Sequence, residues 1–331
     1  MSTMPQARQK LTNIDWWDIC RGMDALPLTD DIAWTPTTDL RKGRRCSGSF
    51  AISGKIWVVG GVCEDGQDAD IEVYDPSLNC WLQKQNPFSA TGQVFAATSE
   101  GKIFSFGGEP IGMQMPTIVE MYDTVTGSLT RMPDMPVGCW RPGVAVTEMG
   151  NIYLLGGYVA PAMTIDTVQE YNTLTHVWTI RKSMPTKRYD LAAVTGRDGK
   201  IYAMGGIVHN RAEDLATLEV YNPITNFWAV REAMLTPRRS LAAVSAEGRI
   251  FAIGGLHSCA AIGIVEEYDP VKNRWEAKTP LLTDRWSLAA TSVEERVYAI
   301  GGCRRTVEAM SEGPSVSMLA DVEVGSLVIP S

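Results

Sequence analysis

The stretch GKIYAMGG, residues 199–206, recurs with small changes along this chain of 331 residues. Its other copies are GKIWVVGG (54–61), GKIFSFGG (101–108), GNIYLLGG (150–157), GRIFAIGG (248–255) and ERVYAIGG (295–302). The first glycines of neighbouring pairs are 47 to 49 residues apart. A period of this length with strand-forming residues predicts a ring or array of small β-sheets rather than two ordinary domains.

Each unit contains residues for four strands. The first two strands form a predicted hairpin, made of an apolar run, a turn that contains Gly and the stretch before the glycine pair. A third strand ends in Tyr followed by Asp or Asn, which favours a turn. The tyrosines are Tyr74, Tyr122, Tyr171, Tyr221 and Tyr268; seven residues later stand Trp81, Leu129, Trp178, Trp228 and Trp275.

The glycine pair, the Tyr and the Trp at a fixed offset resemble kelch repeats. This resemblance covers residues 31 to 331 and implies an all-β fold: a six-bladed β-propeller whose blades are four-stranded and antiparallel. It also implies that the glycines allow neighbouring strands to approach closely and that the Trp packs between blades, which agrees with the usual roles of these residues.

The sixth unit has no Tyr and Trp after its glycine pair. DVEV (321–324) is similar to the third strand of the other units, and DIAW (31–34) is similar to the fourth, with Trp34 lying 47 residues before Trp81. We therefore expect the two ends of the chain to build the closing blade together, so that pairing of the terminal strands closes the ring.

Residues 1–30 lie outside the repeats and contain Trp16 and Trp17. They are interpreted as an N-terminal extension, either a docking segment or a segment packed on the propeller. The extension is too short for the BTB domain that often precedes kelch repeats.

The composition and the N-terminus predict a protein of the cytoplasm. The net charge of −8 is made of interspersed charges, so neither nucleic-acid nor membrane partners are expected. We find no secretory signal, and the seven cysteines include no CxxC pair and are interpreted as reduced thiols. No cofactor is predicted.

The candidate binding site lies at one mouth of the central channel, where loops follow each fourth strand. In kelch domains that bind peptides, similar positions line the mouth, often with arginines that hold acidic groups; this carries over cleanly only to Arg141. Aromatic residues at these positions suit protein contacts. The predicted partner-binding residues are Arg45, Gln93, Trp140, Arg141, Tyr189, Asp190, Arg239, Ser240, Trp286 and Ser287.

Several alternatives stay open at the mouth. The same side chains would also serve simply to cover the sheets, and Asp190 beside Arg141 or Arg239 suits an ion pair. The long segment 303–321 is either a specificity element or a plain connection. His209 and His257 stand in equivalent loops near Cys259 and Cys303, a set that suits a metal, although none is predicted here.

The function favoured is that of a protein–protein interaction module, a scaffold or a ubiquitin-ligase substrate adaptor, that recognises a protein or peptide at the mouth. The alternative is an enzyme of isomerase or lyase type in the channel mouth, although no catalytic residues are identified. The oligomeric state is left open.

Overall fold

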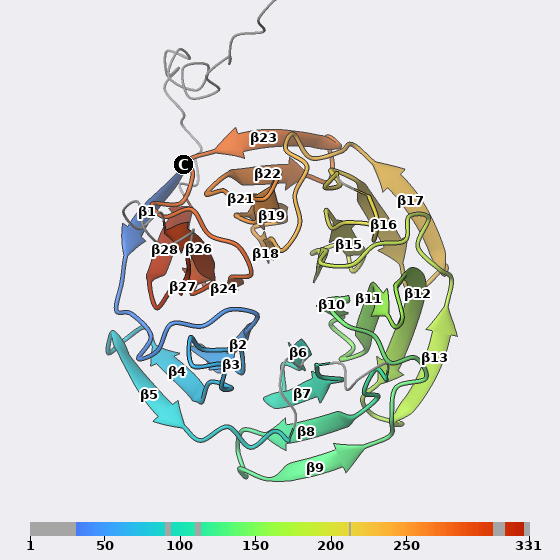
Figure 1. Ribbon diagram of the computed structural model, residues 1–331, viewed down its shortest axis with the longest axis horizontal. Coiled ribbons are helices and arrows are strands. Elements are labelled where there is room, and N and C mark those ends of the chain that lie inside the picture. Colours follow the sequence, from blue (N-terminus) through green and yellow to red (C-terminus); the bar gives the residue numbers. More distant parts are fainter. Residues whose placement is uncertain (1–30, 90–93, 110–113, 212, 307–314, 328–331) are drawn as a thin grey trace, which may run out of the picture.

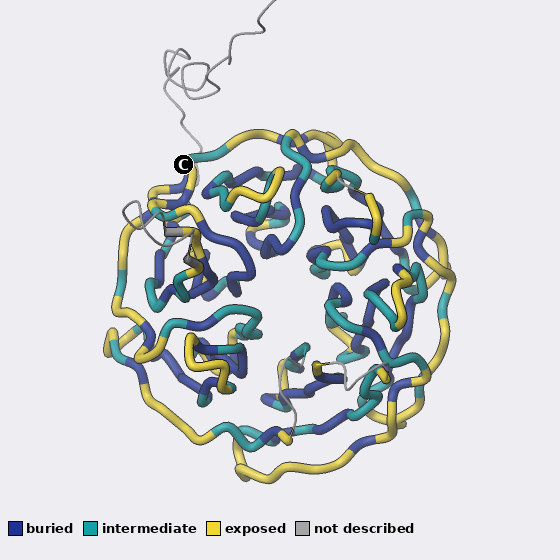
Figure 2. Tube along the Cα trace, viewed as in Figure 1, coloured by how far each residue is buried: buried dark blue, intermediate teal, exposed yellow. Residues whose placement is uncertain are grey.

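The chain forms a ring of six four-stranded antiparallel sheets around a central channel (Figure 1), as seen in a computed structural model. The structure describes residues 31–89, 94–109, 114–211, 213–306 and 315–327. Exposed residues gather on the outer rim and on the loops, whereas the interiors of the sheets are buried (Figure 2). These ranges contain no helix long and apolar enough to span a membrane. The predicted six-bladed β-propeller is confirmed.

The blades are numbered in chain order, and each is given from its innermost to its outermost strand. Blade 1 is β2 (Gly48–Ile52), β3 (Lys55–Val59), β4 (Ile71–Asp75) and β5 (Cys80–Lys84). Blade 2 is β6 (Val94–Ala97), β7 (Lys102–Phe106), β8 (Val119–Asp123) and β9 (Leu129–Met132). Blade 3 is β10 (Gly143–Val146), β11 (Ile152–Val159), β12 (Met163–Asn172) and β13 (Val177–Arg181).

The second half of the ring follows the same order. Blade 4 is β14 (Ala192–Thr195), β15 (Ile201–Met204), β16 (Leu218–Asn222) and β17 (Phe227–Arg231). Blade 5 is β18 (Ala242–Ala246), β19 (Arg249–Ile253), β22 (Val265–Asp269) and β23 (Arg274–Lys278), with a small hairpin of β20 (Leu256–His257) and β21 (Ala260–Ala261). Blade 6 is β24 (Ala289–Val293), β25 (Arg296–Ile300), β28 (Val322–Leu327) and β1 (Ile32–Pro36), with a hairpin of β26 (Cys303–Thr306) and β27 (Ser315–Met318).

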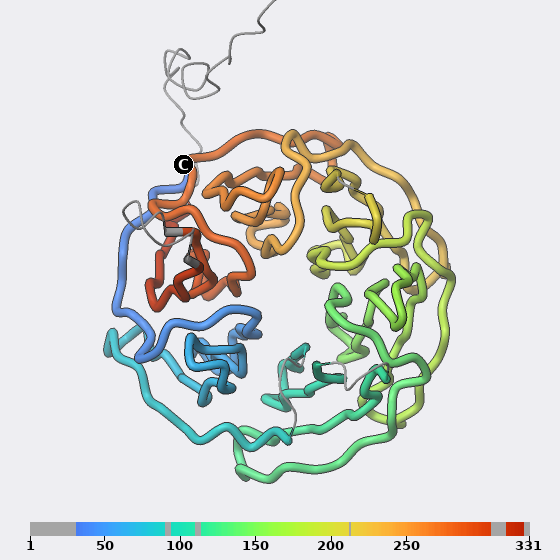
Figure 3. Tube along the Cα trace, viewed as in Figure 1, coloured from blue at the N-terminus to red at the C-terminus, as the bar shows by residue number. Residues whose placement is uncertain are grey.

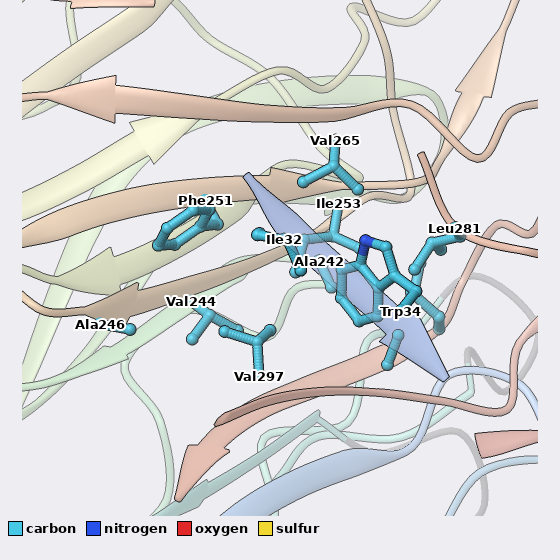
Figure 4. Packing of buried hydrophobic residues seen from close by; sticks show 12 residues of the cluster. Ile32, Trp34, Ala242, Val244, Ala246, Phe251, Ile253, Val265, Leu281 and Val297 are labelled. Carbon is cyan, nitrogen blue, oxygen red and sulfur yellow. The ribbon is translucent and has the colours of Figure 1, made fainter. Parts of the chain in front are cut away.

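Blade 6 closes the ring from both ends of the described chain, as the sequence predicts. β1 pairs antiparallel with β28, so that Trp34 lies opposite Gly325. The blue start of the tube therefore lies beside its red end (Figure 3). Ile32 and Trp34 from β1 pack into a buried apolar cluster with Phe251 and Val265 of blade 5 (Figure 4). This contact ties the first described strand to both of the last two blades. Residues 1–30 lie outside the described residues.

The turns form where the sequence places Asx residues. In blade 4, for example, the side-chain oxygen of Asn222 accepts the N–H of Ile224 at 2.9 Å, and Asp269 accepts that of Val271 at 2.9 Å in blade 5. Such local hydrogen bonds mimic a backbone turn and reverse the chain between the third and fourth strands.

The repeated tryptophans fasten five of the six blades to the preceding blade, whereas blade 2 has Leu129 at this position. The indole N–H of Trp228 donates to the carbonyl of Lys182 at 2.8 Å, and that of Trp275 donates to Glu232 at 2.9 Å. Trp34, Trp81 and Trp178 make the same bond to the carbonyls of Thr279, Thr38 and Pro133. Because each acceptor follows the fourth strand of the preceding blade, these bonds form a belt around the rim.

The glycine pairs make the close approaches that the repeat predicts. Gly205 and Gly206 have φ angles of 65° and 95°, a region that side-chain-bearing residues rarely adopt. A Cβ atom added at Gly205 would lie 2.5 Å from the carbonyl oxygen of Arg238 in the next blade. The N–H of Gly206 donates to that same carbonyl at 2.9 Å, so the pair forms a backbone bond between blades.

The arginines at these carbonyls are buried charges that the sequence analysis missed. In four blades an Arg with at most 1% exposure faces a buried Glu. Arg188 lies 2.7 Å from Glu219, and Arg238 lies 2.5 Å from Glu266. The other two pairs are Arg44 with Glu72 and Arg285 with Glu323. The guanidinium groups also donate to strand-end carbonyls, as Arg188 does to Thr217 at 3.0 Å.

Burial lowers the pKa of all four arginines against the opposing effect of the glutamates, and it lowers the pKa of Arg188 to about 10. Arg188 therefore stays charged at neutral pH. A buried charge is tolerated only when it is paired and hydrogen-bonded, and each of the four arginines has both kinds of partner.

Blade 3 replaces both members of the pair by neutral residues. Cys139 stands where the arginine would be, and Gln169 stands where the glutamate would be. The amide of Gln169 both accepts the N–H of Val137 at 2.8 Å and donates to its carbonyl at 2.9 Å. The chain thus contains a neutral version of the same joint, in which both charges have been exchanged together.

We predict that Arg188→Cys destabilises the protein by about 3–5 kcal/mol, because Glu219 is left buried without its cation. Adding Glu219→Gln should recover a large part of that loss, because the double variant carries the neutral residue pair found in blade 3. Urea denaturation of the two variants measures both effects. A double variant no more stable than Arg188→Cys alone would contradict this account of the joint.

Candidate functional site

Main-chain hydrogen bonds join the innermost residues of five blades into an open ring around the channel mouth. The N–H of Cys46 donates to the carbonyl of Ser287, Ser287 to Ser240, Ser240 to Asp190, and Asp190 to Arg141, at 2.8–3.0 Å. All five residues have positive φ angles between 51° and 59°. Gln93, the equivalent residue of blade 2, lies outside the described residues. The ring depends on main-chain atoms, so its side chains are free to differ.

A cavity of about 220 Å³ opens at this mouth. The predicted residues Arg45, Trp140, Arg141, Asp190, Ser240 and Ser287 line it, together with Cys46 and Glu109. The structure therefore brings these residues from different blades together around one opening. Tyr189, Arg239 and Trp286 lie outside the lining of the cavity.

The residue before each ring position makes a backbone bridge. In each case the partner is the residue that follows a glycine pair. The bridges join Arg45 to Val62, Trp140 to Tyr158, Tyr189 to Ile207, Arg239 to Leu256 and Trp286 to Cys303. Trp286 is buried at 8% exposure, so its ring belongs to the framework rather than to an open surface. The other four side chains are partly exposed.

Acidic neighbours neutralise two of the three arginines near the mouth. One guanidinium nitrogen of Arg141 lies 2.9 Å from both carboxylate oxygens of Asp190 in the next blade. Although burial acts against it, Asp190 raises the pKa of Arg141 well above its ordinary value. Arg239 pairs with the buried carboxylate of Asp214. The two arginines are therefore charges already balanced within the protein.

Arg45 differs from them. Within the described ranges its guanidinium has no ion pair, and its Nε atom is buried without a hydrogen-bond partner. Leaving a buried N–H group without an acceptor costs free energy. A hydrogen-bond acceptor placed beside the cavity would therefore stabilise the Arg45 guanidinium.

Four rings lie together at the top of blades 3 and 4. The ring of Tyr158 lies 6.4 Å from that of Trp140, 5.6 Å from Tyr189 and 5.3 Å from His209, between centroids. The guanidinium carbon of Arg141 lies 4.3 Å from the centroid of Trp140. We call Trp140, Tyr158, Tyr189 and His209 the aromatic cluster. Tyr158 was missed from the sequence, although it stands directly after a glycine pair, and His209 was considered there only as a metal ligand.

The histidines and cysteines of the neighbouring loops have separate partners. The Nδ1 atom of His257 lies 2.7 Å from the carbonyl oxygen of Pro237, whereas His209 packs on Tyr158. Burial raises the pKa of the Cys303 thiol to about 12. No three metal-ligating side chains come together in the part of the chain that the structure describes.

The two ends of the long segment after the sixth glycine pair form a hairpin. β26 pairs with β27 from Cys303 opposite Met318 to Thr306 opposite Ser315. Residues 307–314 lie outside the described residues. The segment is therefore an extra two-stranded element on blade 6 rather than a plain connection.

Comparison with known proteins finds one family across most of the ring. Residues 92–302 match the model of the KLHDC2/KLHL20/DRC7 Kelch-repeats domain, and residues 43–87 match the Kelch motif. Kelch-like protein 24 of Rattus norvegicus and of Mus musculus are each 28% identical over 104 residues, which is 31% of this chain and 16% of the relative. The similarity therefore spans a small part of those longer proteins.

We predict that Ser240→Gly changes stability by less than about 0.5 kcal/mol, because glycine adopts the positive φ of the ring without strain. Ser240→Val should cost about 1–2 kcal/mol, because a β-branched residue is strained in this conformation. Urea denaturation measures both, with Ser245→Val on β18 of the same blade as a control outside the ring. Equal stability of the glycine and valine variants would show that the ring conformation matters little.

Proposed function

Because the chain belongs to the kelch-repeat family, we propose that it is a protein-interaction module that binds a protein or peptide at the mouth of the channel. The observation that carries this proposal is the combination of Arg45, the cavity and the aromatic cluster on one face. The ring beneath them is held by main-chain bonds, so the fold does not require these particular side chains.

The chemistry of the mouth favours a partner with both an acidic and an apolar group. Arg45 offers an unpaired cation to a carboxylate, and hydrogen bonds to charged groups are stronger than neutral ones. The aromatic cluster offers rigid rings a short distance along the same face, the residue type that most often dominates binding energy. A peptide that turns at the mouth would contact both.

The role of a scaffold or ubiquitin-ligase substrate adaptor is part of this proposal. It is supported by the resemblance to the kelch domains of such adaptors and by the partial match to Kelch-like protein 24. The cytoplasmic location and the absence of nucleic-acid or membrane partners remain predictions from the sequence.

We predict that the triple variant Arg45→Ala, Trp140→Ala, Tyr158→Ala loses at least tenfold of its bound partners, because it removes the cation and two of the rings. Affinity capture from the native cell followed by quantitative mass spectrometry measures the loss. The matched control is Leu82→Ala with Leu78→Ala, which removes exposed side chains of blade 1 far from the mouth.

Partners recovered equally by the triple variant and the control would place the binding face elsewhere. A small metabolite that co-purifies with the wild-type protein but not with the triple variant, without any protein partner, would support an enzyme in place of a binding module.

A further inference from the structure

Among the described residues, no strand pairs with the outer edge of β17, the outermost strand of blade 4. β17 is the last strand of its sheet, and it runs along the rim of the ring (Figure 1). The carbonyl of Thr217 accepts the N–H of Gly205 on the inner side of β16. Backbone groups alternate in direction along a strand, so residues 218, 220 and 222 of β16 face β17. They lie opposite residues 231, 229 and 227. The N–H and C=O groups of residues 228 and 230 of β17 therefore point outward, away from the sheet.

The side chains along this edge are apolar and exposed. Phe227 is 58% exposed and Val230 is 66% exposed, on the two opposite faces of the strand. Exposure on both faces fits a strand added to the edge better than a helix laid on one face. Natural proteins usually protect such an edge with charges, and β17 carries none before Arg231.

The equivalent strand of blade 5 shows what a protected edge looks like in this same chain. β23 has the sequence RWEAK where β17 has FWAVR. Arg274 stands at the position of Phe227, and Glu276 stands at that of Ala229. The fold therefore accepts charges at both positions, and their absence from β17 is not a requirement of the propeller.

We propose that β17 is a self-association edge, which pairs antiparallel with β17 of a second copy around a two-fold axis at Ala229. In this register Phe227 lies opposite Arg231 of the second copy, and Trp228 lies opposite Val230. The outward N–H and C=O groups of residues 228 and 230 then exchange hydrogen bonds across the axis. The small side chain of Ala229 lets the two strands meet at the centre.

The cross-strand pairs in this register are favourable. Arg231 is exposed and has no ion pair within the described ranges, so it is available to stack on Phe227 of the second copy as a cation–π pair. One face of the Phe227 ring already carries Lys182, whose Nζ lies 4.7 Å from the centroid, and the other face receives the arginine.

The same pairing is unfavourable at β23. There the two-fold axis would bring Glu276 against Glu276 of the second copy and Arg274 against Lys278, and like charges directly opposite each other repel. In β13 the arginine at the equivalent position, Arg181, is already bound to Glu170. A dimer formed through β17 would leave the channel mouth of each copy open, so that one particle presents two mouths.

Sedimentation equilibrium of the full chain, from about 1 to 200 µM, tests the proposal. We expect a reversible equilibrium between the 36.2 kDa chain and a particle of twice that mass. Phe227→Arg should weaken the dimer at least tenfold, because the introduced arginine then lies opposite Arg231 of the second copy. The double variant Phe227→Arg, Arg231→Phe exchanges the two members of each pair and should restore the dimer.

Val177→Arg on β13 is the matched control, because it adds the same charge at the equivalent position of blade 3 and should leave the dimer unchanged. Circular dichroism and thermal unfolding confirm that each variant is folded. A wild-type protein that stays monomeric up to 200 µM overturns the proposal. A dimer that survives Phe227→Arg, or that the exchange variant fails to restore, overturns it equally.

Discussion

The buried arginine beside four of the six glycine pairs is the constraint on which most of the ring depends. In blade 4 the guanidinium of Arg188 is held by Glu219 and by strand-end carbonyls of its own blade. Its main-chain carbonyl, in turn, accepts the N–H of Gly157 in the preceding blade. Arg188 therefore holds the strand ends of its own blade together and also makes the contact, here called the seam, with the preceding blade. A charge of this kind is costly to bury, and the cost is offset only while every partner stays in place.

Three sets of hydrogen bonds between neighbouring blades close the ring. Main-chain bonds join the innermost residues, the glycine pairs bond to the arginine carbonyls at an intermediate radius, and the tryptophan indoles bond across the rim. All three repeat from blade to blade and use few of the exposed side chains. The mouth and the outer edges are consequently free to vary, and there the blades differ in charge and in aromatic content. The proposed function therefore rests on residues that interrupt the repeat.

The sequence predicted the fold well, because the glycine pairs, tyrosines and tryptophans each report a local constraint that recurs around the ring. It also located the mouth, since the position after each fourth strand follows from the register. The arginine–glutamate joints were missed, although Arg188, Arg238 and Arg285 each stand directly before a candidate residue. Their glutamates lie 28 to 38 residues downstream, a spacing set by loops of unequal length. The aromatic cluster was missed in part because Tyr158 and His209 meet only through the packing of two adjacent loops.

The central claim is that the buried arginine carries the seam between blades, and amide hydrogen exchange of the glycines tests it most directly. In the wild-type protein the amides of Gly157 and Gly255 should both be protected, because each donates to an arginine carbonyl. In Arg188→Cys the account predicts faster exchange at Gly157, whose acceptor has lost its anchor, and unchanged exchange at Gly255, whose acceptor is Arg285. Undiminished protection of Gly157 in this variant would contradict the claim.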